Sequence, residues 1–82
     1  MNTAVITSTN DIAVNYSGNV NETDFTNSDF TTTPGAFSPD TIDQGFPDQL
    51  ILTFLEDITS ETLLTYNGSV AGIQTPQAIA II

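Results

Sequence analysis

The sequence predicts an all-β fold, a small antiparallel sandwich or barrel of about six to seven strands with a long polar loop in its first half. Three observations lead to this prediction. Apolar and polar residues alternate over residues 3–16, which is the period of a strand with one buried face. Fourteen threonines and seven asparagines suit exposed β faces and turns. Asn67-Gly68 is the dipeptide most favoured in two-residue hairpin turns.

Residues 3–16 predict a hairpin. Its inward positions are Ala4 and Ile6 in the first strand and Ile12, Val14 and Tyr16 in the second. Residues 8–11, reading Ser-Thr-Asn-Asp, have the side chains that favour a turn between them. The first strand is expected over residues 3–7.

Residues 17–48 predict a loop-rich region. Up to residue 33 the region is dominated by Asn, Thr, Ser and acids, so we expect a long loop or a weak edge strand anchored by Val20, Phe25 and Phe30. Prolines and glycines then interrupt the chain, which disfavours both a helix and a regular central strand. In this second part the side chains expected to fill the core are Phe37, Ile42 and Phe46.

The stretch Gln49 to Leu55 predicts the strongest strand of the chain. It is almost continuously apolar, so we expect it in the middle of a sheet with both faces covered. Residues 56–60 turn the chain, and Thr62 to Tyr66 is the next expected strand. A helix over residues 57–64 is the alternative, and the β-branched residues together with the Asn-Gly turn favour the strand.

The last part of the chain predicts a second hairpin. A type I′ turn at Asn67-Gly68 is expected to lead into strand residues 69–71. Residues 72–76 contain Gly72 and Pro76 and interrupt the pairing. The apolar run 77–82 is expected to form the final strand. Eighty-two residues allow one domain, 1–82.

The charge of the chain excludes several functions. It has ten acidic residues and no Lys, Arg or His, which gives a formal net charge of −10. Contacts to phosphate need Lys or Arg, so nucleic acid is excluded as a direct partner. A Ser or Thr nucleophile has no His or Lys to activate it, so we predict that the protein is not an enzyme. No apolar run reaches the 18 residues of a membrane span, and we expect no membrane partner.

One stretch resembles a known class of domain. Residues 50–58, LILTFLEDI, followed by 63–68, LLTYNG, resemble the strand-and-corner pattern of bacterial immunoglobulin-like modules. This sequence departs from the pattern of those modules at Leu55, where they usually carry a small polar residue. The resemblance covers about a quarter of the chain and implies a β-sandwich. The other interpretation is a generic buried strand followed by a polar turn.

Acidic residues suggest a metal site. Calcium binds carboxylate, amide and backbone oxygens. The sequence places such ligands together in three clusters, which are Asn19, Asn21, Glu22 and Asp24, then Asp40 and Asp43, then Glu56, Asp57 and Glu61. The residues named as candidate metal ligands are Asp40, Asp43, Glu56 and Asp57. A twelve-residue calcium loop is absent from the sequence, and the alternative is a solvated loop at each position. We therefore predict no obligatory cofactor and name calcium as the ion to test.

The two ends of the chain suggest contacts with other proteins. Apolar strands at 3–7 and 77–82 would invite pairing with a neighbour if they lay at a sheet edge. The alternative is that both strands pair within the domain. The predicted interface consists of apolar side chains in the terminal strands and the loop-rich region, namely Ala4, Ile6, Phe25, Phe30, Phe37, Ile79 and Ile81.

These observations favour a non-enzymatic structural subunit of a larger assembly. We expect a virion protein, either a capsid decoration or a tail-associated protein, that binds copies of itself or an underlying capsid subunit. The retained Met1 and the lack of a secretory signal at the start of the sequence favour a chain made in the cytoplasm and then assembled. The alternative is an extracellular or cell-surface filament or adhesin module joined by strand donation or calcium. An acidic inhibitor of a basic surface is a third hypothesis, disfavoured because the acids are scattered.

Overall fold

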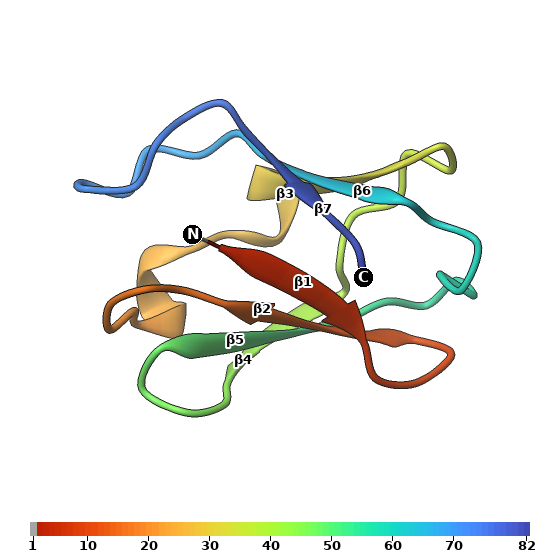
Figure 1. Cartoon of the computed structure of the whole chain (residues 1–82), viewed down its shortest axis with the longest axis horizontal. Helices are drawn as coiled ribbons and strands as arrows, with labels where there is room; N and C mark the ends of the chain where they lie inside the picture. The colour runs from red at the N-terminus through yellow and green to blue at the C-terminus, as the bar shows by residue number, and fades with distance from the viewer. Residues whose placement is uncertain (1) are drawn as a thin grey trace.

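The computed structural model describes residues 2–82 and places seven strands in two antiparallel sheets (Figure 1). The first sheet consists, in spatial order, of β1 (Thr3–Ile6), β2 (Asp11–Asn15), β5 (Gln49–Thr53) and β4 (Thr41–Gln44). The second consists of β3 (Phe30–Thr33), β6 (Leu63–Tyr66) and β7 (Gln77–Ala80). Two short 3-10 helices, η1 (Glu22–Asp24) and η2 (Asn27–Asp29), precede β3. The predicted all-β sandwich is confirmed.

The strand order has a known counterpart. Constant-type immunoglobulin domains arrange strands A, B, E and D in one sheet and C, F and G in the other, which is the order seen here when the seven strands are lettered along the chain. The agreement concerns topology alone. Kinship with the bacterial modules stays a prediction.

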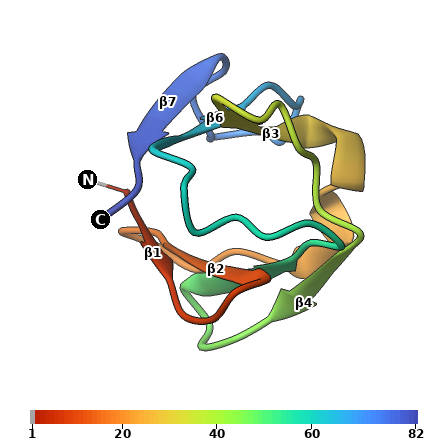
Figure 2. The same cartoon turned by 90° about the vertical axis from the view of Figure 1, so that its right-hand side faces the viewer.

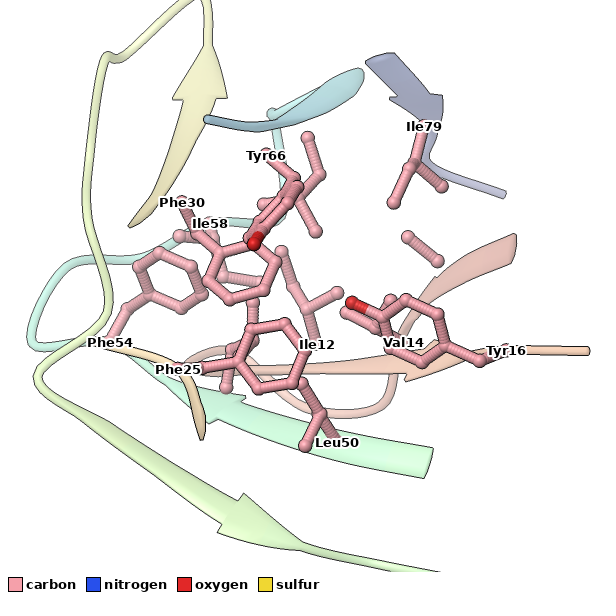
Figure 3. Packing of buried hydrophobic residues seen from close by; sticks show 13 residues of the cluster. Ile12, Val14, Tyr16, Phe25, Phe30, Leu50, Phe54, Ile58, Tyr66 and Ile79 are labelled. Atoms are coloured by element: carbon pink, nitrogen blue, oxygen red, sulfur yellow. The ribbon is translucent and has the colours of Figure 1, made fainter. Parts of the chain in front are cut away.

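The core lies between the inner faces of the two sheets (Figure 3). Alternate residues of the strands point inward, because successive side chains of a strand lie on opposite faces. The first sheet contributes Ile12, Val14, Leu50 and Leu52, and the second contributes Phe30, Leu64, Tyr66 and Ile79. All eight side chains are buried. Ala4 of β1 is also fully buried, so the first and last strands both help to build the domain's own core.

Strand β5 lies in the middle of its sheet, between β2 and β4, as predicted. The prediction that both of its faces are covered is wrong. Leu50 and Leu52 are buried, whereas Gln49, Ile51 and Thr53 are only partly buried. Their face is the outer face of a two-layer sandwich, so no further layer covers it.

One end of the sandwich is closed by residues 54–62, the segment that crosses the view in Figure 2. Its Phe54 and Ile58 side chains are buried. Their backbone N–H groups donate to the carbonyl oxygens of Asn10 and Thr9 in the β1–β2 turn, at 2.8 and 2.9 Å. The hairpin turn and this segment therefore hold each other in place.

The sides of the sandwich are closed by the end of the chain and by the polar segment. Ala4 and Ile81 form a parallel bridge, and the Ile82 N–H donates to the Ala4 carbonyl at 2.8 Å. On the opposite side the Gln44 carboxamide oxygen of edge strand β4 accepts from the Glu22 N–H of η1 at 3.0 Å. The loop-rich region thus contains two edge strands, β3 and β4, in addition to its loops.

The predicted type I′ turn at Asn67-Gly68 is wrong. Residues 67–76 form a loop without strand, and β7 begins at Gln77. The loop folds back over Tyr66, whose hydroxyl accepts the Val70 N–H at 3.0 Å. Gly68 lies against this ring, while Gly72, with φ of 83°, adopts the left-handed conformation that favours glycine. A tertiary contact therefore replaces the local turn.

The contact between Gly68 and Tyr66 yields a prediction about stability. A Cβ at Gly68 would lie 2.5 Å from the Tyr66 hydroxyl oxygen, whereas a Cβ at Gly18 would meet nothing within 4 Å. We expect Gly68→Ala to lower the free energy of unfolding by about 1–3 kcal/mol through overpacking. The control, Gly18→Ala, should change it by no more than about 0.5 kcal/mol. Urea unfolding measures both, and equal effects of the two substitutions would contradict the described packing.

Candidate functional site

A groove of about 770 Å³ opens at the end of the sandwich opposite to residues 54–62. It lies between the connection that follows β2, residues 17–21, and the β6–β7 connection, residues 70–74. Small-molecule pockets have volumes of about 300–1,000 Å³. The groove is therefore the first candidate for a binding site.

The inner wall of the groove is aromatic. Phe25 follows η1, and its ring centroid lies 6.2 Å from that of Tyr16, 5.8 Å from Phe30 and 5.7 Å from Tyr66. The Phe25 and Tyr66 rings meet edge to face at 67°, a favourable arrangement for two aromatic rings. These contacts join the polar segment to both sheets and fix the position of the groove wall.

The rim of the groove carries neutral amides. Among the described residues that line it, Asp24 is the only charged side chain, and the amides are Asn2, Asn19, Asn21, Gln74 and Gln77. The Asn2 amide donates to the Gln77 side-chain oxygen at 2.8 Å. Amides both donate and accept hydrogen bonds, so this rim suits uncharged polar groups.

The Tyr16 hydroxyl is the one unusual polar group in this wall. Only 8% of Tyr16 is exposed, and its hydroxyl is buried without a hydrogen-bond partner among residues 2–82. Figure 3 shows the hydroxyl directed toward the interior of the cluster. Burial raises the pKa of Tyr16 above its usual value, and the nearby Tyr66 raises it further.

A second feature at this end is the exposed ring of Phe46 in the β4–β5 hairpin. Phe46 is 71% exposed, yet its backbone is held firmly. The Phe46 carbonyl accepts from the Gln44 side chain at 2.8 Å and from the Gln49 N–H at 2.9 Å. The neighbouring Pro47 carbonyl accepts from the Val20 N–H at 2.9 Å, which ties the hairpin to the groove loop. Phe46 was expected in the core, and this expectation is wrong.

The structure places most of the predicted interface residues inside the domain. The side chains of Ala4, Phe25, Phe30 and Ile79 belong to the buried core. Ile6, Phe37 and Ile81 are partly buried and pack against that core. The four core side chains have almost no exposed surface to offer a partner in this fold, and contacts through the other three stay a prediction.

The two predicted pairs of calcium ligands, Asp40 with Asp43 and Glu56 with Asp57, stay a prediction. No group of three or more acidic side chains that could hold a metal ion occurs within residues 2–82. Asp40 and Asp43 are exposed, and they lie in and beside β4. Asp57 accepts from the N–H and the hydroxyl of Thr59, at 2.9 and 2.6 Å, which lowers its pKa below the usual value.

Glu61 is the acid that sequence reasoning missed as a structural residue. It is only 7% exposed, and its Oε1 accepts from the Thr32 hydroxyl at 2.7 Å and from the Gly35 N–H at 2.6 Å. The Thr32 hydroxyl in turn accepts the Phe37 N–H at 3.0 Å. This carboxylate therefore organises the turn after β3. Nothing in the local sequence distinguishes it from the exposed acids.

Comparison with known proteins finds no matching family model, no matching curated protein and no matching solved structure. Among residues 2–82, no helix is long and apolar enough to cross a membrane.

The buried Tyr16 hydroxyl yields a prediction about pH dependence. An unfolded chain ionises tyrosine near pH 10, whereas burial keeps the native Tyr16 protonated to higher pH. Stability from this group is fully present below about pH 10 and is lost as the pH rises toward the raised pKa. We expect Tyr16→Phe to change the free energy of unfolding at pH 7 by less than about 1 kcal/mol. Above about pH 10 the free energy of unfolding of the variant should fall less steeply with pH than that of the wild type.

Urea unfolding of both proteins at neutral pH and in the alkaline range measures this difference. The chain has no Lys, Arg or Cys and only two tyrosines, so few other side chains titrate there. Identical alkaline slopes for the wild type and Tyr16→Phe would show that the Tyr16 hydroxyl is not protected by burial.

Proposed function

We propose that this chain is a non-enzymatic structural subunit of a larger assembly, in the first place a virion protein such as a capsid decoration or tail-associated protein. Phe46 is the observation that carries the proposal. A large apolar ring at 71% exposure lies on a hairpin in which the Gln44 side chain donates to the Phe46 and Gln49 carbonyls and the Gln49 side-chain oxygen accepts from the Phe46 N–H. A rigid aromatic side chain is a common anchor of protein interfaces.

The energetics support Phe46 as a contact residue. Burying a phenylalanine side chain contributes about 1.5–3 kcal/mol. Because the hairpin backbone is already ordered, little additional conformational entropy is lost on binding. The chain carries ten acidic and no basic side chains, and this net negative charge keeps free subunits apart until a specific contact forms. The partner in this proposal is a second copy of the chain or an underlying subunit.

The proposal predicts self-association that depends on Phe46. We expect the sedimentation coefficient of the wild type to rise with protein concentration, and Phe46→Ser to weaken the association at least about tenfold, since that factor corresponds to about 1.4 kcal/mol. Sedimentation velocity over a range of protein concentrations at physiological salt measures this.

Leu55→Ser is the matched control for this experiment. Leu55 is also exposed, at 77%. It follows the C-terminal end of β5, whereas Phe46 precedes the N-terminal end, so replacing Leu55 should leave the association unchanged. A wild type that stays monomeric at every concentration, or an association that Phe46→Ser leaves intact, would contradict a Phe46-mediated assembly.

A second candidate is an extracellular filament or adhesin module, and the strand order favours it. The two sheets have the strand order of constant-type immunoglobulin domains, and modules of this kind are joined by strand pairing or by calcium. Repeating the sedimentation in millimolar calcium and in chelator, at equal ionic strength, distinguishes the extracellular module from the virion protein. Association that requires calcium favours the module.

A further inference from the structure

We propose that Asn67 is a site of spontaneous modification, at which its side-chain amide is converted through a cyclic intermediate to aspartate and isoaspartate. Asparagine is among the thermolabile residues of proteins, and its reactivity depends on its surroundings. Three observations support the proposal, namely the residue that follows Asn67, the weak bonding of its side chain and its place in a loop. The proposal is independent of the structural role, which depends on Phe46.

The reaction uses the backbone nitrogen of the next residue as the nucleophile. The Gly68 nitrogen forms a bond to the Asn67 Cγ, the Cγ–Nδ2 bond breaks, and the amide nitrogen leaves as ammonia with the proton of the Gly68 N–H. The product is a succinimide ring in the backbone. Water then opens the ring at either carbonyl carbon, which gives aspartate or isoaspartate. The sum of the two steps is one amide plus one water giving one acid plus one ammonia.

The residue after Asn67 favours this attack. Asn67-Gly68 is the only Asn-Gly pair of the chain, and every other asparagine precedes a residue with a side chain. Glycine has no Cβ and reaches conformations that other residues avoid, so its nitrogen approaches the carboxamide without hindrance. The Gly68 N–H donates no hydrogen bond within residues 2–82. No bond to this nitrogen therefore has to break before it attacks.

The Asn67 side chain is exposed and weakly held. Within residues 2–82 its one hydrogen-bonding contact is the Thr75 hydroxyl at 3.4 Å from its Oδ1, which is longer than the usual O–H···O distance. By contrast, the Asn10 and Asn27 amides donate to backbone carbonyls at 2.9 and 2.6 Å. The Asn67 carboxamide can therefore rotate toward the Gly68 nitrogen at little cost.

The backbone at Asn67 lies just outside the strand ladders. Asn67 follows the last residue of β6, and residues 67–76 form no strand. The start of this loop is held by the Asn67 N–H, which donates to the Asp29 carbonyl at 2.7 Å, and by the Val70 N–H, which donates to the Tyr66 hydroxyl at 3.0 Å. Segments with few such bonds open ahead of the rest of a domain, which gives the backbone the freedom that ring closure needs.

The modification changes both the charge and the packing of this part of the fold. Residues 62–82 contain no Asp or Glu, so the new carboxylate is the first acidic side chain in β6, β7 and the loop between them. Isoaspartate also adds a CH2 group to the backbone next to Gly68. A Cβ at Gly68 would already lie 2.5 Å from the Tyr66 hydroxyl oxygen, so we expect the longer backbone to disturb this contact. Aspartate leaves the backbone unchanged.

The test ages the whole folded chain at physiological pH and temperature and follows its asparagines by mass spectrometry. Cleavage after glutamate in denaturant releases residues 62–82, in which Asn67 is the only asparagine. Asn19 is the internal control, because it is exposed but precedes Val20 instead of a glycine. We expect Asn67 to be modified at least about tenfold faster than Asn19, with both aspartate and isoaspartate among the products.

Two variants connect the modification with the packing at Gly68. Asn67→Gln keeps an amide whose larger ring closes more slowly, so its urea midpoint should not change on ageing. Asn67→Asp carries the charge of the product on a normal backbone, and its midpoint should stay close to that of the fresh wild type. We expect the isoaspartate form, separated from the aged wild type by ion exchange, to unfold at a lower urea concentration than Asn67→Asp.

Two results would overturn the proposal. One is an aged, folded chain in which Asn67 stays unmodified or reacts no faster than Asn19. The other is an isoaspartate form that unfolds at the same urea concentration as Asn67→Asp, which would overturn the inferred effect on packing. Neither result bears on self-association through Phe46, so failure of this proposal and failure of the proposed function are distinguishable.

Discussion

The packing of Phe25 against Tyr16, Phe30 and Tyr66 is the contact on which the rest of the structure depends. The chain has no cysteine and no Lys, Arg or His, so neither disulfides nor ion pairs between side chains can hold its long polar segment in place. Phe25 is the only buried residue of residues 17–29, and it joins this segment to both sheets. The position of Phe25 therefore determines one wall of the groove and the placement of η1 against β4.

Four of the ten acids of this chain accept hydrogen bonds from Ser or Thr hydroxyl groups, in a protein that has no Lys or Arg to pair with them. Several carboxylates accept hydrogen bonds from Ser or Thr, in the pairs Asp11 with Ser8 and Thr53, Asp29 with Thr26, Asp57 with Thr59, and Glu61 with Thr32. Hydrogen bonds to a charged acceptor are stronger than those between neutral groups. The abundance of threonine therefore has a structural reason in addition to β propensity, because the hydroxyls stabilise a fold that carries ten negative charges.

The positions of β1, β2, β5, β6 and β7 were predictable from the sequence, whereas β4 and the tertiary contacts were not, and the strand expected at residues 69–71 is absent from the described structure. Alternation located β1 and β2, and apolar continuity located β5 at the centre of its sheet. The prediction of a turn at Asn67-Gly68 was wrong because the buried Tyr66 ring, which packs against Phe25 and Phe30, determines the path of the following loop. Phe25 and Phe46 look alike in the sequence, and the structure buries one and exposes the other. Burial of a loop phenylalanine depends on the path of the backbone, which composition does not determine.

Amide hydrogen exchange of Phe25→Leu measures most directly whether this side chain holds the groove end together. Phe54→Leu, a buried phenylalanine at the opposite end, is the comparison. We expect Phe25→Leu to reduce protection chiefly in residues 16–29, above all at the Val20 N–H that bonds the Pro47 carbonyl, and Phe54→Leu to leave these amides protected. Opening of one part of a domain ahead of the rest is measurable in this way. A uniform loss of protection in both variants would contradict the central place given to Phe25.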